Sequence, residues 1–340
     1  MKKRPTIGDV AELAKVSDMT VSRILAGKAK HGPATTERVL KAAEVLGYRP
    51  NGFARQLRKK DQPIVGVIFT RLPESSATLD LFESKILGSL EAELIKNRIP
   101  VLLSSVSSAE IEAGTMPDIV TQGYVDTVVC LFLENPAYVA SLKSRTRHLI
   151  HIGRTDASIA QVDTDNRSGA QIAARHLHTL GHRDIVLVRP KEHVLDHIER
   201  VEVFVSEFVA IAGAEGRIRF AECSVWNDDF INSALDQILK PKLPDAIFCT
   251  NDFLALQILR GLKRHGVAIP DDVSLMGFDD MELAAYSDPP LTTIAIDKLA
   301  IGKKAAELAL DCLRGEAAPP GGPCILPVHL LERATTARRD

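Results

Sequence analysis

The sequence predicts a small all-helical head followed by a larger, two-lobed α/β body of the doubly wound type. Two observations lead to this fold class. Residues 1–60 contain short helical patterns and hold 14 Lys and Arg against 5 Asp and Glu, whereas the remaining 280 residues hold 28 against 39. From Asp61 onward, short apolar runs alternate with helical patterns, which is typical of parallel sheets covered by helices. A chain of 340 residues, 45% of them hydrophobic, is long enough for both parts.

Three short helices are expected in the head. They span 7–15, 18–25 and 35–46, with Ser17 as the N-cap of the second, and Gly47 and Pro50 ending the third. The first two, joined by a tight turn, have the spacing of a helix-turn-helix. Apolar residues at helical spacing give the head a core, namely Ile7, Val10, Leu13, Ala14, Val21, Ile24, Leu25, Val39, Ala42 and Leu46.

The second helix is the candidate for insertion into the DNA major groove. A basic patch confined to one small module indicates a polyanionic partner, because Lys and Arg release counterions from phosphates. Arg23 can pair with a guanine, Met19 can meet a thymine methyl group, and Ser22 lies on the same exposed side. Asp18 either accepts a hydrogen bond from a cytosine amino group or simply favours the helix dipole.

The segment after the head, residues 51–61, has two interpretations. Asn51 can cap one or two turns of helix, but so short a helix is marginal alone and forms only when something packs on it. Leu57 is an apolar residue among basic ones, which suits a wedge between base steps of the minor groove. The alternative is a flexible basic linker with one stray leucine.

The body is expected to contain two lobes of parallel sheet. Helical patterns at 82–96 and 168–180 separate its apolar runs, and the strands up to about residue 160 predict one lobe and those from 184 to 276 a second. Ligands of such sheets bind beyond the carboxyl ends of the strands, so the pocket is expected between the lobes. The expected strands are 64–69, 100–103, 127–132, 148–152, 184–188, 246–249, 273–276 and 292–296.

Composition argues against several other classes of protein. The charged N-terminus lacks the apolar run of a secretion signal, and no stretch approaches the roughly 20 apolar residues of a membrane span, which predicts a cytoplasmic protein. The five cysteines lack C-x-x-C pairing, so we expect no zinc site, disulfide framework or other cofactor. An enzyme using Asp163, Asp165 and His182 as acid and base is one alternative, although the sequence has no phosphate loop or nucleophile elbow. A sugar-binding transport protein is another, but it leaves the basic head unexplained.

Several motifs in sequence order resemble the lactose/galactose repressor (LacI/GalR) family of transcriptional regulators, and the match runs nearly end to end. Lys15 stands where relatives often carry glycine. The motifs are Asp9-Val10-Ala11, Val16-Ser17, Thr20-Val21-Ser22-Arg23, Leu46-Gly47-Tyr48-Arg49-Pro50-Asn51, Ala54-Arg55-Gln56-Leu57, Asp165-Asn166, Leu180-Gly181-His182, Thr250-Asn251-Asp252, Ile269-Pro270-Asp271-Asp272-Val273-Ser274, Gly277-Phe278-Asp279-Asp280 and Pro290-Leu291-Thr292-Thr293-Ile294.

For the DNA-binding part, the resemblance implies a homodimeric repressor on a near-palindromic operator. Recognition helices would enter the major groove, and paired hinge helices would open the minor groove through Leu57. The head would span 1–50 and the hinge 51–61. The DNA-contacting residues that follow are Thr6, Ser17, Asp18, Met19, Thr20, Ser22, Arg23, Asn51, Ala54, Arg55, Leu57 and Arg58.

For the body, residues 62–336, the resemblance implies a periplasmic-binding-protein-like domain that binds a small-molecule effector. Lobe 1 would comprise about 62–159 and 291–318, and lobe 2 about 160–290 and 319–336. The effector, a sugar or sugar derivative, would act either as inducer or as corepressor. The implied effector-binding residues are Phe82, Arg200, Trp226, Asn251 and Asp279, with Arg71 and Asp80 as further first-lobe candidates.

Two residues beside Arg200 leave the kind of sugar open. A carboxylate, an amide and a guanidinium suit vicinal hydroxyls, and an aromatic ring can cover the apolar face of a sugar. His197 and Glu199 flank Arg200 and are either solvent-facing or indicate an unusual ligand, such as an acidic or amino sugar.

Overall fold

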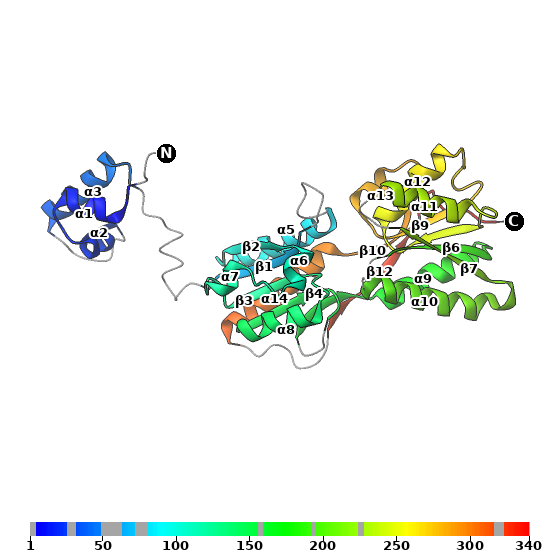
Figure 1. Ribbon diagram of the computed structural model, residues 1–340, viewed down its shortest axis with the longest axis horizontal. Coiled ribbons are helices and arrows are strands. Elements are labelled where there is room, and N and C mark those ends of the chain that lie inside the picture. Colours follow the sequence, from blue (N-terminus) through cyan, green and yellow to red (C-terminus); the bar gives the residue numbers. More distant parts are fainter. Residues whose placement is uncertain are drawn as a thin grey trace. The chain divides into compact units, whose positions relative to one another are not determined.

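The protein divides into two compact units, Met1–Gln62 and Pro63–Asp340 (Figure 1). The structure is a computed structural model. It describes residues 5–25, 32–48, 63–71, 81–155, 159–191, 195–223, 228–315 and 323–339.

The N-terminal unit contains the three helices that the sequence predicts, α1 (Ile7–Ala14), α2 (Asp18–Leu25) and α3 (Pro33–Val45). The third begins two residues earlier than expected because Pro33, with its fixed φ, occupies the first helical position. One small core joins the helices, formed by Val10, Ala11, Ala14, Val21, Ile24, Val39, Ala42 and Ala43.

Local hydrogen bonds define the turn between α1 and α2. Thr6 and Asp9 form a reciprocal capping box at the start of α1. Ser17 Oγ accepts a hydrogen bond from the backbone N–H of Thr20 at the start of α2. Lys15 ends α1 in the left-handed region, with φ 51°, a conformation that glycine adopts more easily.

The C-terminal unit contains two six-stranded sheets, which confirms the predicted two-lobed α/β class (Figure 1). The first sheet has the order β11-β5-β4-β3-β1-β2, and all its pairs are parallel. Its strands are β1 (Val65–Thr70), β2 (Val101–Val106), β3 (Thr127–Leu131), β4 (His148–Ile152), β5 (Ala160–Thr164) and β11 (Cys324–Leu326).

The second sheet has the order β12-β10-β9-β8-β6-β7. Only β12 is antiparallel to its neighbour among the described strands of this sheet, and it lies at the edge. The strands are β6 (Asp184–Pro190), β7 (Arg217–Cys223), β8 (Ala246–Cys249), β9 (Ser274–Asp279), β10 (Thr292–Ile296) and β12 (Val328–Leu331).

Helices pack on these sheets to form lobe 1, around the first sheet, and lobe 2, around the second. In lobe 1, α14 packs closely on α5, and Gly302 permits the approach because a Cβ there would collide with the Ile86 carbonyl. Lobe 1 has α5 (Leu81–Lys96), α6 (Ser108–Glu112), α7 (Asp118–Thr121), α8 (Pro136–Arg145) and α14 (Lys298–Arg314). Lobe 2 has α9 (Asn166–Thr179), α10 (Leu195–Ala212), α11 (Asp228–Leu239), α12 (Asp252–Arg264) and α13 (Glu282–Tyr286), with a 3₁₀ turn at Gly213–Glu215.

The chain crosses between the lobes at positions that differ from the predicted boundaries. The predictions at 160, 291 and 319 assigned β5 and β11 to lobe 2 and β10 to lobe 1, whereas β5 and β11 belong to the first sheet and β10 to the second. Each crossing strand completes its backbone hydrogen bonds in one sheet before the chain leaves that sheet. Two crossovers end in an aspartate that caps the next helix, Asp165 for α9 and Asp297 for α14.

Candidate DNA-binding helix and effector site

Helix α2 has one buried and one exposed face. Val21 and Ile24 are buried in the core of the N-terminal unit. Asp18, Ser22 and Arg23 are exposed, and Met19 is 62% exposed even though it is a large apolar side chain. The predicted base-contacting residues therefore lie on the surface of one helix, which is the arrangement that major-groove reading needs.

The other predicted DNA-contacting residues fall into two groups. Thr6 is exposed and Thr20 half-buried, and both take part in capping hydrogen bonds, Thr6 with Asp9 and Thr20 with Ser17. These bonds orient their hydroxyl groups near the starts of α1 and α2, where backbone N–H groups favour phosphates. The remaining predictions, Asn51, Ala54, Arg55, Leu57 and Arg58, lie outside the described residues.

In the C-terminal unit, Arg200 and Asp279 form a buried ion pair. Arg200 comes from α10, Asp279 ends β9, and Arg200 Nη1 lies 3.0 Å from Asp279 Oδ1. The guanidinium also donates to Asn166 Oδ1 at 2.7 Å and to the Thr250 carbonyl at 2.7 Å. Its Cζ atom lies 3.8 Å from the centroid of the Phe278 ring. The fold therefore brings together two of the residues that the family resemblance selected.

The backbone at Asp279 is unusual. Asp279 has φ 112° and Asp280 has φ 52°, both in the region that favours glycine. Arg333 Nη2 donates to Asp280 Oδ1 at 2.6 Å and helps to hold this turn. Non-glycine residues in such conformations cost free energy and occur frequently at ligand sites. The strain supports a functional role for the carboxyl end of β9.

Lys298 also belongs to this site, although the sequence did not predict it. It begins α14 of lobe 1, yet its ammonium donates to the carbonyls of Asp279 and Asp280 in lobe 2, at 2.6 and 2.9 Å, and to that of Ile296 at 3.2 Å. Its side chain is buried, and burial lowers its pKa. The available indication in the sequence was that Lys298 follows Asp297, the helix cap at which the chain crosses from lobe 2 to lobe 1.

Asn251 lies next to this ion pair but has a structural task. Its Oδ1 atom accepts a hydrogen bond from the Leu254 N–H at 2.9 Å, which caps α12. The neighbouring residue on one side, Thr250, provides the carbonyl for Arg200. On the other side, Asp252 is buried and accepts hydrogen bonds from Met281 and Thr293. Asn251 is thus held at the carboxyl end of β8, beside Arg200.

The first-lobe side of the site is built from aromatic side chains. Phe82, at the start of α5, packs against Phe132 with ring centroids 5.8 Å apart, and Lys298 Nζ lies 5.7 Å from the Phe82 ring centroid. Arg71 is directed elsewhere, because its guanidinium contacts Ser105 and Glu110 within lobe 1. Two predicted residues, Asp80 and Trp226, lie outside the described residues.

His197 and Glu199 both have partners in the structure. His197 Nδ1 lies 2.6 Å from Thr250 Oγ1, and burial lowers the pKa of the imidazole to about 3, so the ring is neutral at pH 7. Glu199, 18% exposed, pairs with Arg154 of lobe 1 at 2.7 Å. Both residues are half-buried and have partners within the protein, and the two interpretations of them stay open.

Three further carboxylates lie where the lobes meet. Glu134 follows β3, Asp163 is in β5, and Asp196 is in the first turn of α10. Burial first, and then the charge of Asp196, raise the pKa of Glu134 to about 7 and that of Asp163 to about 7. Burial also raises the pKa of Asp196. The geometric link is the Leu195 N–H, next to Asp196, which donates to Glu134 Oε1 at 3.3 Å.

The acid and base set considered for an enzyme is not assembled. Asp163 lies near the carboxyl end of β5, and Asp165 caps α9 through Ser168. His182 precedes β6, whose other end leads to α10 and Asp196, and this seven-residue strand spans roughly 20 Å. His182 is therefore remote from Asp163.

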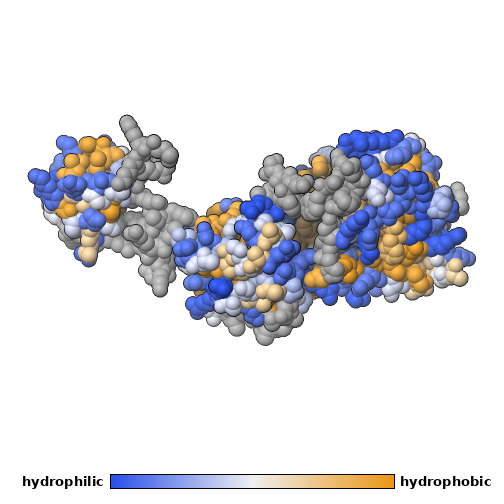
Figure 2. Space-filling model, in the orientation of Figure 1, coloured by the Kyte–Doolittle hydropathy of each residue, from blue (hydrophilic) through white to orange (hydrophobic). Residues whose placement is uncertain are grey.

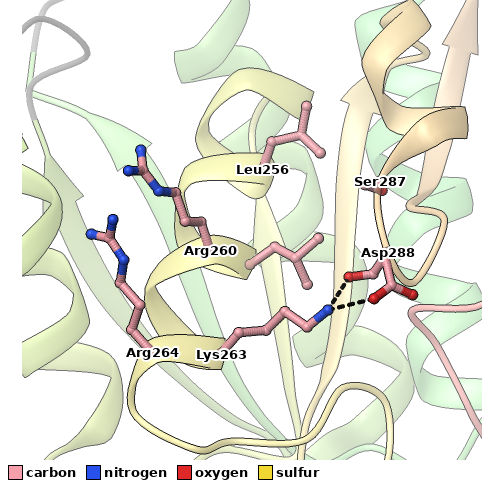
Figure 3. Close-up of a pocket in the computed structure, with 7 residues that line it drawn as sticks. Leu256, Arg260, Lys263, Arg264, Ser287 and Asp288 are labelled. Atoms are coloured by element: carbon pink, nitrogen blue, oxygen red, sulfur yellow. Dashed lines mark hydrogen bonds and ion pairs between the residues drawn. The ribbon is translucent and has the colours of Figure 1, made fainter.

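A shallow pocket of about 450 Å³ lies elsewhere on lobe 2 (Figure 3). It is lined by residues near the end of α12, including Arg260, Lys263 and Arg264, and Lys263 Nζ binds Asp288 Oδ2 at 2.8 Å. Figure 2 shows both hydrophilic and hydrophobic surface on the visible face of lobe 2. Its lining includes neither Asn251 nor Arg200 nor Asp279, so this pocket is distinct from the candidate effector site.

The described residues include no helix that is both long and apolar enough to cross a membrane. In the same part of the chain, no three His, Cys, Asp or Glu side chains are grouped so that they can hold a metal ion.

The fold and site define a class of protein, a helix-turn-helix head joined to a two-lobed domain of the periplasmic-binding type. The model of bacterial regulatory proteins of the lacI family matches residues 6–51, and that of the periplasmic binding protein-like domain matches residues 174–336. The HTH-type transcriptional repressor CytR of Escherichia coli (strain K12) is 30% identical over 92% of this chain and 90% of its own length. The chain therefore belongs to the LacI family of bacterial transcriptional regulators.

Other relatives span the chain in the same way. The HTH-type transcriptional regulator CelR of Thermobifida fusca is 27% identical over 98% of both chains. The structure of the Lac repressor dimer bound to operator and the anti-inducer ONPF has a TM-score of 0.77 and 25% identity, and the match covers 98% of this chain and 100% of that one. A LacI family regulator from Enterococcus faecium with bound ribose has a TM-score of 0.69 and 26% identity, covering 81% and 100%.

Proposed function

We propose that this chain is a homodimeric transcriptional repressor that binds a near-palindromic operator and is controlled by a sugar-like effector bound where lobes 1 and 2 meet. Its partners are double-stranded DNA and a small molecule, and its role is not enzymatic. Chromosomal DNA as partner implies a cytoplasmic protein. Relatives named as transcriptional repressors, and relatives solved with an operator or with ribose, support the proposal.

The single observation that carries the effector site is the Arg200–Asp279 pair. It lies where β9 ends, beside the Asn251 cap, and Lys298 of lobe 1 donates a hydrogen bond to the Asp279 carbonyl. A guanidinium and a carboxylate side by side can bind vicinal hydroxyls, one accepting from Arg200 and the other donating to Asp279. Strands of both sheets end here, so a ligand in this place contacts both lobes.

Control of DNA binding follows from contacts that join the lobes. Lys85 of α5 pairs with Glu282 of α13 at 3.1 Å, and Arg154 pairs with Glu199. An effector that binds one arrangement of the lobes better than another shifts the equilibrium by its difference in affinity. We propose that residues 51–61 form the hinge that couples this shift to operator binding, with induction or corepression set by which arrangement the effector prefers.

Exposed apolar residues support a homodimer. Phe253, Leu283 and Tyr286 lie on α12 and α13 of lobe 2, and Tyr286 is 79% exposed. In lobe 1, Ile95 and Leu103 are also more than half exposed. Large apolar side chains that remain at the surface of a monomer frequently mark protein interfaces.

The test is a fluorescence-anisotropy titration of the full-length protein on the DNA upstream of its own gene, repeated with a panel of sugars, sugar acids and sugar phosphates. Specific binding that one compound releases supports an inducible repressor, and binding that one compound strengthens supports corepression. Substitution Leu57→Ala is expected to weaken operator binding far more than effector binding. Absence of sequence-preferring binding, with a shallow salt dependence, would contradict the DNA-binding role.

A further inference from the structure

Three carboxylates lie where the two lobes meet, near the candidate effector site. They are Glu134, Asp163 and Asp196, here called the acidic triad. Glu134 and Asp163 belong to lobe 1, and Asp196 begins α10 of lobe 2. The Leu195 N–H donates to Glu134 Oε1 at 3.3 Å, which fixes the start of α10 against lobe 1. Asp163 Oδ1 accepts from the Thr164 N–H at 2.7 Å. Arg200, the effector-site arginine, lies four residues after Asp196 on the same helix, one turn away.

The cations nearest the acidic triad are already engaged. Arg200 is paired with Asp279 and bonded to Asn166, and Arg154 is paired with Glu199. His151 faces carbonyl oxygens at both ring nitrogens, Gly153 at 3.0 Å and Leu133 at 2.9 Å, and burial lowers its pKa. Within the described part of the chain, no ion pair joins Lys or Arg to any member of the triad.

Asp196 supplies an independent observation. Its Oδ1 atom is shielded from solvent and accepts no hydrogen bond from any residue that the structure describes. A shielded carboxylate oxygen without a donor lowers the stability of the folded protein, because it has lost its hydrogen bonds to water and forms none with the protein. Native proteins retain such an atom chiefly where a function or a bound group accounts for it. A ligand with a hydrogen-bond donor, ideally a cationic one, can supply what the described residues do not.

We infer that the effector carries a protonated amine, which binds between Asp196 of lobe 2 and the carboxylates of Glu134 and Asp163 in lobe 1, while its hydroxyl groups bind Arg200 and Asp279. This inference rests on the proposed function. It narrows the ligand to an amine-bearing polyol, the amino-sugar member of the alternatives that the sequence left open.

The same arrangement accounts for control. Without ligand, charged carboxylates of opposite lobes repel each other, and the raised pKa values of Glu134 and Asp163 mean that protonation relieves part of this repulsion. An ammonium group placed between them favours their charged forms and supplies three hydrogen-bond donors. The effector therefore favours the arrangement in which lobes 1 and 2 are closest around the triad.

The first experiment does not need the identity of the effector. A small-molecule extract of bacterial cells is passed over a strong cation exchanger at pH 6, which separates a retained pool from a flow-through pool. Metal ions are removed from the retained pool with a chelating resin. Each pool is then tested for its effect on operator binding by the full-length protein. Activity in the retained pool is expected. Activity only in the flow-through overturns the inference and leaves the proposed function intact, whereas activity in neither pool overturns both.

The second experiment compares matched compounds by calorimetry on the full-length protein: glucosamine, galactosamine and mannosamine, each against its neutral parent sugar and its N-acetyl derivative. At least one amine is expected to bind tenfold or more tightly than both neutral counterparts. Neutral sugars that bind as well as, or better than, the amines overturn the inference, as does a series in which no amine binds measurably.

Variants separate charge from shape. Asp196→Asn, which keeps the size of the side chain, is expected to weaken binding of the active compound at least tenfold, and Asp196→Glu is expected to restore part of it. Operator binding and cooperative unfolding should persist and serve as folding checks. The control is Asp236→Asn, because Asp236 is an exposed carboxylate of α11 paired only with Lys240. Equal binding by Asp196→Asn and the wild type would overturn the inference.

Discussion

Arg200 and Asp279, 79 residues apart in the chain, form an ion pair of 3.0 Å with side chains only 5% and 11% exposed. Removing one partner of such a pair leaves the other charge buried, which typically costs about 3 to 5 kcal/mol. The pair is therefore both a proposed ligand-binding element and a structural one.

Asp279→Ala is expected to abolish the response to effector and to retain operator binding, since the N-terminal unit is unchanged. Chemical denaturation should show a loss of about 3 to 5 kcal/mol, because Arg200 loses its buried partner. Asp288→Ala is the matched control, since Asp288 is 93% exposed and paired with a surface lysine. A normal effector response in Asp279→Ala would mean that the pocket is elsewhere.

Lys298→Met is expected to weaken effector binding and to destabilise the protein by about 2 to 4 kcal/mol. Methionine keeps much of the apolar stem but removes the ammonium that the carbonyls of Asp279, Asp280 and Ile296 accept from, so buried acceptors lose their donor. Urea unfolding and calorimetric titration measure the two effects. The exposed neighbour Lys303 provides the comparison, and equal stability of Lys298→Met and Lys303→Met would contradict the structural role.

The sequence predicted most strands of the body but not their assignment to lobes. Strands 148–152, 246–249 and 292–296 match the structure in both bounds, because each is rich in apolar and β-branched residues. Four strands were not predicted. β5 includes Gln161, Asp163 and Thr164, which conceal its apolar pattern, and β7, β11 and β12 lie at sheet edges. Which sheet a strand joins depends on pairing between distant segments, so the lobe boundaries were misplaced.

For the candidate site, the resemblance selected Arg200 and Asp279, but local patterns could not. Lys298 stands in the first turn of a helix, where a lysine is ordinarily solvated, and its burial arises only because α14 of lobe 1 meets β9 of lobe 2. Asp196 likewise favours a helix N-terminus in any sequence. That its Oδ1 atom is shielded and accepts no hydrogen bond from the described residues is a property of the folded structure.

His197→Gln is expected to change how stability depends on pH. The pKa of His197 falls to about 3 in the folded protein from 6.5, so between these values the unfolded chain binds more protons. The stability contribution is fully present above about pH 6.5 and is lost as the pH falls towards 3. The free energy of unfolding, measured with urea from pH 4 to 6.5, should therefore rise with pH less steeply in His197→Gln than in the wild type. The slopes should differ by up to about 1.4 kcal/mol per pH unit. Parallel curves would contradict the buried, neutral histidine.

Asp163→Asn is expected to shift the same profile in the opposite direction. The pKa of Asp163 rises from 3.8 to about 7 in the folded protein, so the folded chain binds more protons between these values. Its contribution favours folding below about pH 4 and is lost as the pH rises through 7. Asp163→Asn should thus be more stable than the wild type at pH 8 relative to pH 5. Asp236→Asn serves as control, and an unchanged difference between the two pH values would contradict the burial of this carboxylate.

Arg23→Ala is expected to weaken specific operator binding by about 1 to 3 kcal/mol and to relax the preference at one base pair of each half-site, because Arg23 is exposed on α2 beside Met19. Anisotropy with the operator and its single-base variants measures both effects. Arg38→Ala, an exposed arginine on α3, is the matched control and should reduce affinity for all sequences alike or leave it unchanged. If Arg23→Ala weakened operator and random DNA equally, Arg23 would be a phosphate contact, and base recognition would have to come from Met19, Ser22 and Asp18.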